Sequence, residues 1–404
     1  MKLLYIHQYF AFPDIHSSTR SYDLASAFVK KGIEVTVITT TTKIKGLNER
    51  KRWNYIKRDG ISLWVLTNIY YQQMSPGQRL KAFLVFMFFA TIRAMKIRCD
   101  LVLATSSPLT VAVPALLKRL MNRTPYIFEV RDIWLETLIR IGFIRNRFLI
   151  MILRSFEKIV YNNAYLIVPL SVDMETVIIN TCNHANTVVI PNISEIIRFQ
   201  SEIYSFNIDL DIDLKSKRTV LYAGAIARGN GIKYVADLAI RFYRLNPEVI
   251  FVIIGVGNEK EMIINYCKNC GILNKNIFFL APVPKESLPY LYSVCTIGSS
   301  FVIDNPILWA NSANKFFDTL AAGKPVLINY LGWQADLIQR EALGYVLPPR
   351  ITDQDIFLFN NYINDDNLLE EHSKNALAIA KRYFSLEVAA EKYLDIFNKF
   401  RVMN

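Results

Sequence analysis

Short apolar runs and longer segments of helical spacing alternate along the first half of the chain. Residues 2–8 have a strand pattern, residues 19–31 a helical pattern that ends at Gly32, and residues 35–40 form a β-branched strand. These three segments predict a β-α-β unit. Further strands are predicted at residues 62–67, 101–104, 126–130, 166–169 and 188–190. Several are apolar throughout, as in parallel strands covered on both faces.

Pro191 and Asn192 interrupt this pattern, and after a polar stretch the alternation starts again. The second half has a predicted helix at residues 233–245, a last helix at about 386–400, and strands at 219–222, 250–254, 277–280, 296–299 and 325–329. The chain is therefore predicted to be an α/β protein with two doubly wound Rossmann-like domains, residues 1–193 and 194–380. Ligands of such folds bind at the carboxyl ends of the strands.

Composition agrees with a globular two-domain protein of 404 residues, 52% of them hydrophobic. Its five cysteines are scattered, so we expect no disulfide framework and a reducing compartment. The Cys267–Cys270 C-x-x-C pair has no second pair to complete a metal site. The N-terminal residues alternate like a strand and show no apolar export signal, which favours a cytoplasmic location.

The net charge of +12 is confined to the first half: residues 1–195 contain 25 Lys and Arg against 13 Asp and Glu, and residues 196–404 contain 22 of each class. A basic domain indicates an anionic partner, either nucleic acid or a membrane surface. Residues 80–98 and 139–158 mix large apolar residues with Arg and Lys. The apolar run from Ala82 to Ala90 is too short to span a bilayer. We expect peripheral docking on the inner face of the plasma membrane. The alternative is two partly buried helices with solvated basic edges.

Two segments of the second half have the residues of a phosphate site. Residues 224–231 (GAIARGNG) lie between a strand and a helix, so Gly224 and its neighbours allow close backbone approach and Arg228 can neutralise charge. Such glycines also occur for steric reasons, and the loop lacks a P-loop ending. In residues 311–326, Asn311 or Ser312 can cap a helix whose first turn contains Asn314 and Lys315, with Asp318 one turn later. The alternative is an ordinary capped helix with solvated Lys and Asp.

Several motifs, in order, resemble the nucleotide-binding half of glycosyltransferase family 4. They are G-x-I-x-R-x-N-G-I at 224–232, I-I-G-V-G-x-E at 253–259, A-P-V-P-x-x-x-L-P-x-L-Y at 281–292 and N-K-F-F-D-x-L-A-A-G-K-P-V at 314–326. In the first half, residues 16–25, 31–39 and 128–136 resemble the branch that builds O-antigen and capsule polysaccharides. Residues 383–393 also fit, so the resemblance covers nearly the whole chain.

The resemblance implies a GT-B arrangement, in which the first domain binds the acceptor, the second binds the donor, and residues 381–404 return to the first domain as a helix. It also implies retaining transfer without metal or cofactor. The sugar would be an N-acetylated amino or deoxy sugar, moved from a nucleotide diphosphate, UDP above all, to a glycan or polyprenyl-diphosphate-linked acceptor. Arg228 and Lys315 would hold the diphosphate, the main chain of Pro282 and Val283 the base, and Asp318 the ribose. The implied donor-binding residues are Gly224, Arg228, Asn230, Gly257, Pro282, Val283, Asn311, Asn314, Lys315 and Asp318.

The sequence departs from the family in both halves. Many members have a Glu-x7-Glu pair, whose first position is Ala310 in this chain and whose second is Asp318. Asn311, Asn314 or a backbone amide can take over that contact. The first loop, residues 13–20, has no glycine, so His16 and Arg20 are expected to contact ligand by side chain; His16 can alternatively bond at the helix start.

The loop after the strand at 126–130 contributes Arg131 and Asp132, which either line the cleft or form a structural ion pair. Asp132 or Glu136 can accept the acceptor's proton, or the leaving phosphate can do so. The expected catalytic residues are Arg131, Asp132, Arg228 and Lys315, and the expected acceptor-binding residues are His16, Ser17, Arg20, Trp134 and Glu136.

Three other functions are compatible with parts of this sequence to different degrees. A Rossmann-type oxidoreductase would need G-x-G-x-x-G after the first strand, and residues 7–20 lack it. A nucleic-acid-binding protein would explain the basic half but needs a recognition module that the sequence does not display. A non-catalytic family member stays open because of Ala310.

Overall fold

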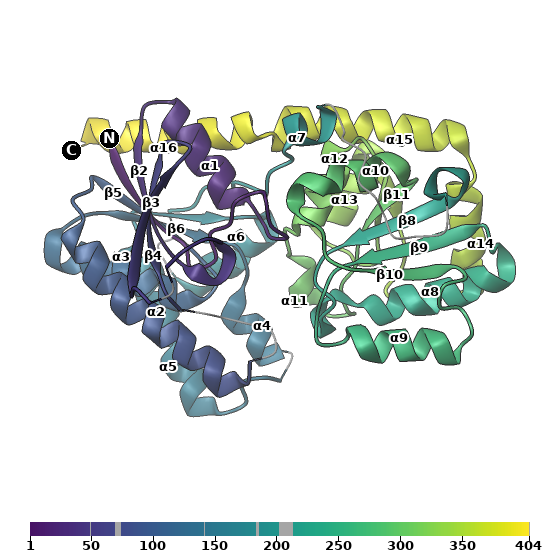
Figure 1. The fold of residues 1–404 in the computed structure, drawn as a ribbon, viewed down its shortest axis with the longest axis horizontal. Helices are drawn as coiled ribbons and strands as arrows, with labels where there is room; N and C mark the ends of the chain where they lie inside the picture. Colours follow the sequence, from purple (N-terminus) through teal and green to yellow (C-terminus); the bar gives the residue numbers. More distant parts are fainter. Residues whose placement is uncertain (49, 69–73, 141, 183–185, 202–212, 404) are drawn as a thin grey trace.

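Two parallel sheets organise the chain (Figure 1). The computed structural model describes residues 1–404 except 49, 69–73, 141, 183–185, 202–212 and 404. Within the described residues the first sheet has strand order β3-β4-β2-β1-β5-β6-β7, and the second has the order β10-β9-β8-β11-β12-β13. The only antiparallel pair among these strands is β3 with β4. The predicted pair of Rossmann-like sheets is confirmed.

Helices cover both faces of the first sheet. Leu3 and Tyr5 of β1 face the side covered by α1 and α16, whereas Leu4 and Ile6 face α2, α3 and α5. The strands are β1 (Lys2–Ile6), β2 (Glu34–Thr40), β3 (Trp53–Arg58), β4 (Ile61–Leu66), β5 (Leu101–Thr105), β6 (Tyr126–Val130) and β7 (Leu166–Pro169). The helices are α1 (Arg20–Lys30), α2 (Pro76–Lys96), α3 (Ala112–Asn122), α4 (Trp134–Arg140), α5 (Arg147–Asn163) and α6 (Val172–Thr181), with short 3₁₀ turns η1 (Thr41–Lys43) and η2 (Leu109–Val111).

The second sheet is also enclosed by helices, and its strand β9, next to the edge strand β10, is buried at every position. The strands are β8 (Arg218–Ala223), β9 (Val249–Ile254), β10 (Ile277–Leu280), β11 (Ile297–Ser300), β12 (Val326–Ile328) and β13 (Gly344–Val346). The helices are α7 (Ile196–Gln200), α8 (Ile232–Leu245), α9 (Lys260–Asn269), α10 (Leu288–Val294), α11 (Pro306–Trp309), α12 (Asn314–Ala321), α13 (Trp333–Glu341), α14 (Asp353–Ile363) and α15 (Asp366–Ile379). Short 3₁₀ turns are η3 (Leu214–Ser216), η4 (Arg228–Asn230) and η5 (Lys285–Ser287).

The chain passes between the domains twice, and the two passages touch. The Ser194 amide donates to the Phe384 carbonyl at 2.7 Å, next to the π-helical turn η6 (Ala380–Phe384). Helix α16 (Leu386–Met403) then lies along α1 of the first domain, where Phe28 packs edge-on against Tyr393 and Phe397. The predicted return of the C-terminal helix is therefore confirmed (Figure 1).

Three local predictions differ from the structure. β3 was not predicted, although Asp59 and Gly60, both at positive φ, form the tight turn that joins it to β4. β13 was also not predicted because it has only three residues, none fully buried. Residues 188–190 are extended and bond to β7, but only Thr187 forms a bridge.

No helix in the described part of the chain is long and apolar enough to cross a membrane. Among the described residues there is also no cluster of three His, Cys, Asp or Glu side chains that could hold a metal ion. Cys267 is buried in α9, and Cys270 follows that helix on the surface.

Candidate donor and acceptor site

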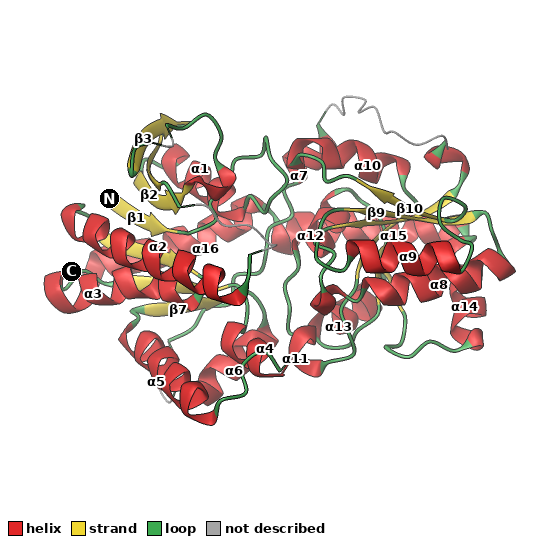
Figure 2. Ribbon diagram, turned by 60° about the horizontal axis from the view of Figure 1, so that its bottom comes forward, coloured by secondary structure: helices red, strands yellow, loops and turns green. Residues whose placement is uncertain are grey.

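Loops from the carboxyl ends of strands in both sheets meet where the domains face each other (Figure 2). The loop after β1 forms hydrogen bonds with the second domain. The Lys285 amide donates to the Ile15 carbonyl at 3.1 Å, and the Ser18 hydroxyl donates to Asn314 Oδ1 at 3.3 Å. Because ligands of parallel α/β folds bind at these strand ends, this interface is the candidate site.

The loop after β8 presents one unpaired cation. Arg228 is exposed, and its guanidinium has no hydrogen bond or ion pair with any described residue. Asn230 Nδ2 donates to the Ala225 carbonyl at 2.9 Å, so this side chain holds the loop in shape. The structure thus leaves Arg228 available to an anion and gives Asn230 a supporting role.

The predicted glycines bring two loops together. A Cβ on Gly257 would lie 1.9 Å from the Ile226 carbonyl oxygen. A Cβ on Gly255 would lie 1.9 Å from the Gly224 carbonyl oxygen. The Ile226 amide donates to the Val256 carbonyl at 2.8 Å. Gly257 is therefore required for packing of the loop after β9 against the loop after β8, which positions Arg228.

Helix α12 begins without a side-chain cap, contrary to prediction. Its N-cap is Ala313; Asn311 Oδ1 accepts from the Ala313 amide at 3.1 Å, and Ser312 Oγ accepts from the Asn192 amide at 3.3 Å. Asn314 is the first helical residue, with Lys315 next to it. Uncapped amides at this terminus have the geometry and partial charge that favour a phosphate.

Lys315 is a buried cation beside the α12 terminus. Its Nζ lies 5.0 Å from the centre of the Tyr222 ring, and the ammonium has no hydrogen bond or ion pair within the described residues. Burial lowers the pKa of Lys315 to about 8, although Asp318 favours the charged form. A desolvated cation with spare donors is suited to an anionic ligand.

Asp318, the predicted ribose-binding residue, is already paired on one side. It is buried, and its Oδ2 accepts from Lys285 Nζ. Lys285 begins η5, two residues after Val283, and the main chain of Pro282 and Val283 is the predicted base contact. Both halves of the expected nucleoside site therefore lie next to one another.

Ala310 occupies the position of the missing carboxylate and lies in an apolar environment. It packs with Ile133, Leu170 and Met174 of the first domain, and its carbonyl accepts from the Ser171 hydroxyl at 2.7 Å. A glutamate here would place an unpaired charge among apolar side chains.

On the first-domain side, Arg131 is linked through Ser18 to Asn314 at the start of α12. Its Nη2 donates to Ser18 Oγ at 2.8 Å, and its Nη1 lies 3.5 Å from His7 Nε2. Since Ser18 also bonds to Asn314, Arg131 lies at the interface between the domains.

Asp132 and Glu136, the two predicted proton acceptors, lie in different environments. Asp132 is reached by solvent but surrounded by protein; burial raises its pKa, with Arg131 and a 3.1 Å hydrogen bond from Ser107 opposing. Glu136 instead pairs with Arg140 and Arg154 at the hollow between α4, α5 and α6. Of these two carboxylates, Asp132 is the one without an ion pair among the described residues.

Of the remaining predicted acceptor residues, Arg20 is placed differently from the expectation. It is 2% exposed, donates to Glu129 at 2.9 Å, and donates to the Ile190 and Pro191 carbonyls. Arg20 thus holds the linker between the domains and cannot contact ligand. The prediction that it binds the acceptor is wrong, because the sequence pattern does not reveal its buried partner Glu129.

Trp134, His16 and Ser17 also have clear positions. Trp134 packs against the core on the α2–α3 side of the sheet. His16 is exposed, and its ring bonds no described residue; α1 begins at Arg20 with Thr19 as N-cap, so the helix-start alternative for His16 is wrong. Ser17 is half-buried beside Ser18.

Sequence reasoning missed Lys285, Ser18 and His7. Lys285 stood at an unspecified position of the A-P-V-P motif, and Ser18 lay inside a quoted motif, so the positions were visible but their contacts were not. His7 follows β1 directly and is buried, with Nδ1 unpartnered among described atoms. Its signal was its place at a strand end.

Comparison with known proteins agrees with this geometry. Residues 17–192 match the family described as glycosyl transferase 4-like domain, and residues 210–378 match glycosyl transferases group 1. The chain belongs to glycosyltransferase family 4.

Two solved structures of known proteins have a similar fold over nearly the whole chain. Sucrose-phosphate synthase from Thermosynechococcus elongatus is 13% identical with a TM-score of 0.76, and the similarity covers 100% of both chains. Anabaena HepE in complex with UDP-glucose is 17% identical with a TM-score of 0.71, covering 99% of this chain and 100% of that one. These similarities establish the GT-B fold of this glycosyltransferase family member.

The relatives found by sequence are about 20% identical and match only part of the chain. Spore coat protein SA of Bacillus subtilis is 22% identical over 202 residues, which is 47% of this chain and 51% of the relative. A glycosyltransferase of Methanocaldococcus jannaschii is 21% identical over 187 residues, 45% of each chain. The match thus spans about half the length of these curated relatives.

Proposed function

We propose that the protein transfers a sugar from a UDP-linked donor to a glycan or polyprenyl-diphosphate-linked acceptor, with retention of configuration and without a metal ion. The observation that carries the proposal is the buried ammonium of Lys315, unpaired among described residues, beside the uncapped start of α12. Arg228 adds a second unpaired cation. HepE, with the same fold, was solved with UDP-glucose, which supports a uridine nucleotide.

The proposed mechanism depends on stabilising the negative charge that develops on the leaving diphosphate. Breaking the bond between the sugar and the diphosphate leaves negative charge on the phosphate oxygens and an oxocarbenium-like sugar. Lys315, Arg228 and the α12 amides would stabilise the leaving diphosphate, the role that a metal ion has in other transferases. Arg131 would position the acceptor, and Asp132 or the leaving phosphate would take the hydroxyl proton.

The proposed sugar is an N-acetylated amino or deoxy sugar of a surface polysaccharide such as O-antigen or capsule. The apolar surroundings of Ala310 support this, because no carboxylate is present there to hold a sugar hydroxyl. The motif resemblance of the first half to that branch also supports it.

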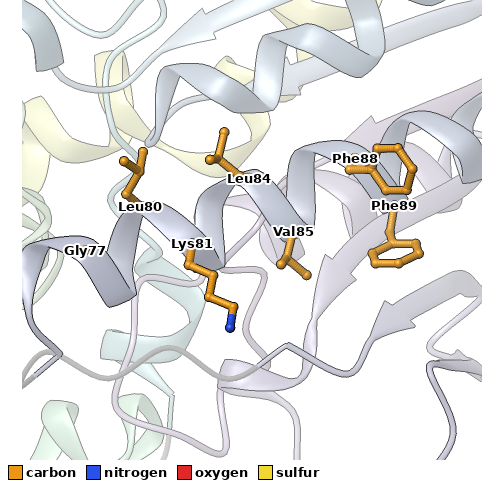
Figure 3. Close-up of a pocket in the computed structure, with 7 residues that line it drawn as sticks. All are labelled: Gly77, Leu80, Lys81, Leu84, Val85, Phe88 and Phe89. Carbon is orange, nitrogen blue, oxygen red and sulfur yellow. The ribbon is translucent and has the colours of Figure 1, made fainter.

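We also propose that the first domain docks on the anionic inner face of the plasma membrane. Leu80, Leu84, Phe88 and Ile92 recur every fourth residue on α2 and are exposed. Figure 3 shows the first three along one side of the helix, with Lys81 on another, around a shallow hollow. The buried side of the same helix, at Phe86 and Ala90, packs on the sheet.

A second exposed apolar surface lies on α5, and α3 contacts both helices. Its exposed apolar residues are Phe148, Leu149, Met151, Ile152 and Ile159, with Arg145, Arg147 and Arg154 beside them. Apolar side chains that insert between acyl chains and cations that meet anionic headgroups are the two components of interfacial binding. A membrane at this face would suit a lipid-linked acceptor.

A thermal-shift screen tests the donor site without a known acceptor. The purified protein would be heated with UDP, GDP, CDP, dTDP, ADP, NAD or a short DNA duplex, without metal. A ligand at 100 times its dissociation constant adds about 2.7 kcal/mol of stability. We expect stabilisation by UDP. Stabilisation by DNA alone would favour nucleic-acid binding, and UDP binding without donor hydrolysis or transfer would favour the non-catalytic alternative.

A further inference from the structure

Lys285 and Asp318 form a buried ion pair inside the proposed donor site. Lys285 is 7% exposed and Asp318 is 5% exposed, and Lys285 Nζ donates to Asp318 Oδ2. The Lys285 ammonium also lies over the Phe199 ring, 5.8 Å from its centre. Asp318 is the polar partner of this ammonium among the described residues, so the two side chains fix each other's position.

The main chain of Lys285 is fixed as well. Its amide donates to the Ile15 carbonyl of the first domain at 3.1 Å, and Pro284 restricts the backbone just before it. The ammonium is therefore held from both ends. One carboxylate oxygen of Asp318 is directed at Lys285, which leaves Oδ1 for another donor.

We propose that Lys285 is a positioning residue that orients Asp318 so that the free carboxylate oxygen accepts hydrogen bonds from the ribose hydroxyls of the donor nucleotide. This inference rests on the proposed function. A free aspartate would have to be ordered when nucleotide binds, whereas the ion pair orders it beforehand. Lys285 acts through Asp318 and does not itself touch the ribose.

The test compares binding of UDP with binding of 2′,3′-dideoxy-UDP, measured by calorimetry. Wild type is expected to bind UDP about 10- to 100-fold more tightly, the scale of hydrogen bonds to a charged group. Lys285→Met is expected to reduce this ratio to about threefold or less, since only the ribose contact is lost. Lys285→Arg, which keeps the charge, should retain most of the ratio.

Two further variants separate positioning from general stability. Lys233→Met breaks a Lys–Asp pair on the surface of the same domain and should leave the ratio unchanged. In an Asp318→Asn background, Lys285→Met should have no further effect on the ratio, because the residue through which it acts is gone. Lys285→Gln replaces Lys285→Met if that variant does not fold.

The outcomes separate this inference from the proposed function. A wild type that binds no UDP overturns both. A wild type that binds UDP and its dideoxy analogue equally, or a Lys285→Met variant with the wild-type ratio, overturns the role of Lys285 and leaves the donor site intact.

Discussion

At the scale of single residues, Lys315 is the side chain whose loss should matter most for turnover. Its ammonium is buried, and no described residue neutralises it by direct contact. We expect Lys315→Ala to lower turnover at least about 100-fold, as for loss of one contact to developing charge. Lys374→Ala, which removes an exposed lysine of α15, is the control. Turnover within about threefold of wild type would contradict the assignment of the diphosphate site.

The titration of Lys315 gives a pH prediction for UDP binding. Burial lowers the pKa of Lys315 to about 8 in the free protein. A bound diphosphate favours the charged ammonium, so the pKa is higher in the complex. Affinity should be constant below pH 8 and fall above it, by up to about tenfold per pH unit. Calorimetry from about pH 7 to 9 measures this. Lys315→Arg, which stays charged throughout, should show no such fall from Lys315.

The role of a residue could be predicted from sequence when its partners lie close to it in the sequence. Lys315 and Asp318 share one helix, so spacing alone brought them together. Arg20 was misjudged because its partner Glu129 is 109 residues away, and a sequence does not show which carboxylate neutralises a given arginine. Lys285 was missed for the same reason, since its ion pair joins the turn η5 to Asp318 of α12, 33 residues away.

At the scale of elements, α2 provides a direct test of membrane docking. Phe88 on α2 is 58% exposed and Phe357 on α14 of the second domain is 57% exposed, so the two are matched in chemistry and accessibility. Phe88→Glu should weaken binding to anionic lipid vesicles about tenfold, from the loss of one buried aromatic side chain and the added repulsion. Phe357→Glu should leave vesicle binding unchanged.

Vesicle flotation with and without salt measures both variants. Equal binding of Phe88→Glu and wild type would show that α2 does not enter the lipid. Because both phenylalanines are exposed, neither substitution should change the melting temperature by more than a few degrees.

Elements with a strong period were predicted from sequence, and weakly patterned ones were not. β6, β7 and β10 have their predicted bounds because each is a short, mostly apolar run of four or five residues. β13 is too short for such a signal, and residues 188–190 have strand composition but lie beyond the regular ladder of β7. The start of α12 was mispredicted because Asn311 and Ser312 bond to groups outside the helix.

At the scale of the whole molecule, one buried network joins the first passage between the domains to the returning helix α16. Glu129 at the end of β6 accepts from Arg20 of α1, from Thr105 of β5, and from Tyr393 of α16 at 2.6 Å. Arg20 in turn donates to the carbonyls of the first passage between the domains, at Ile190 and Pro191. The orientation of the two domains therefore depends on a charge pair that solvent does not reach.

Substituting Glu129 tests this dependence. Burial raises the pKa of Glu129, but Arg20 and Arg131 outweigh it and hold the pKa at about 2, below the ordinary 4.5. Glu129→Gln leaves Arg20 buried without its partner, which should cost about 3–5 kcal/mol of unfolding free energy at pH 6. Wild type should lose this advantage as the pH falls from 4.5 toward 2, because the unfolded chain then binds the extra proton.

Glu157 of α5 is the matched control, because it is a buried glutamate of the same domain whose pKa moves the other way. Burial raises the pKa of Glu157 to about 7, so at pH 6 the side chain is mostly uncharged and a glutamine is a close substitute. We expect Glu157→Gln to change stability at pH 6 by less than about 1 kcal/mol. Chemical denaturation at pH 6 and pH 3 measures both variants. Equal losses for the two would mean that Glu129 stabilises the fold by packing and not by its charge.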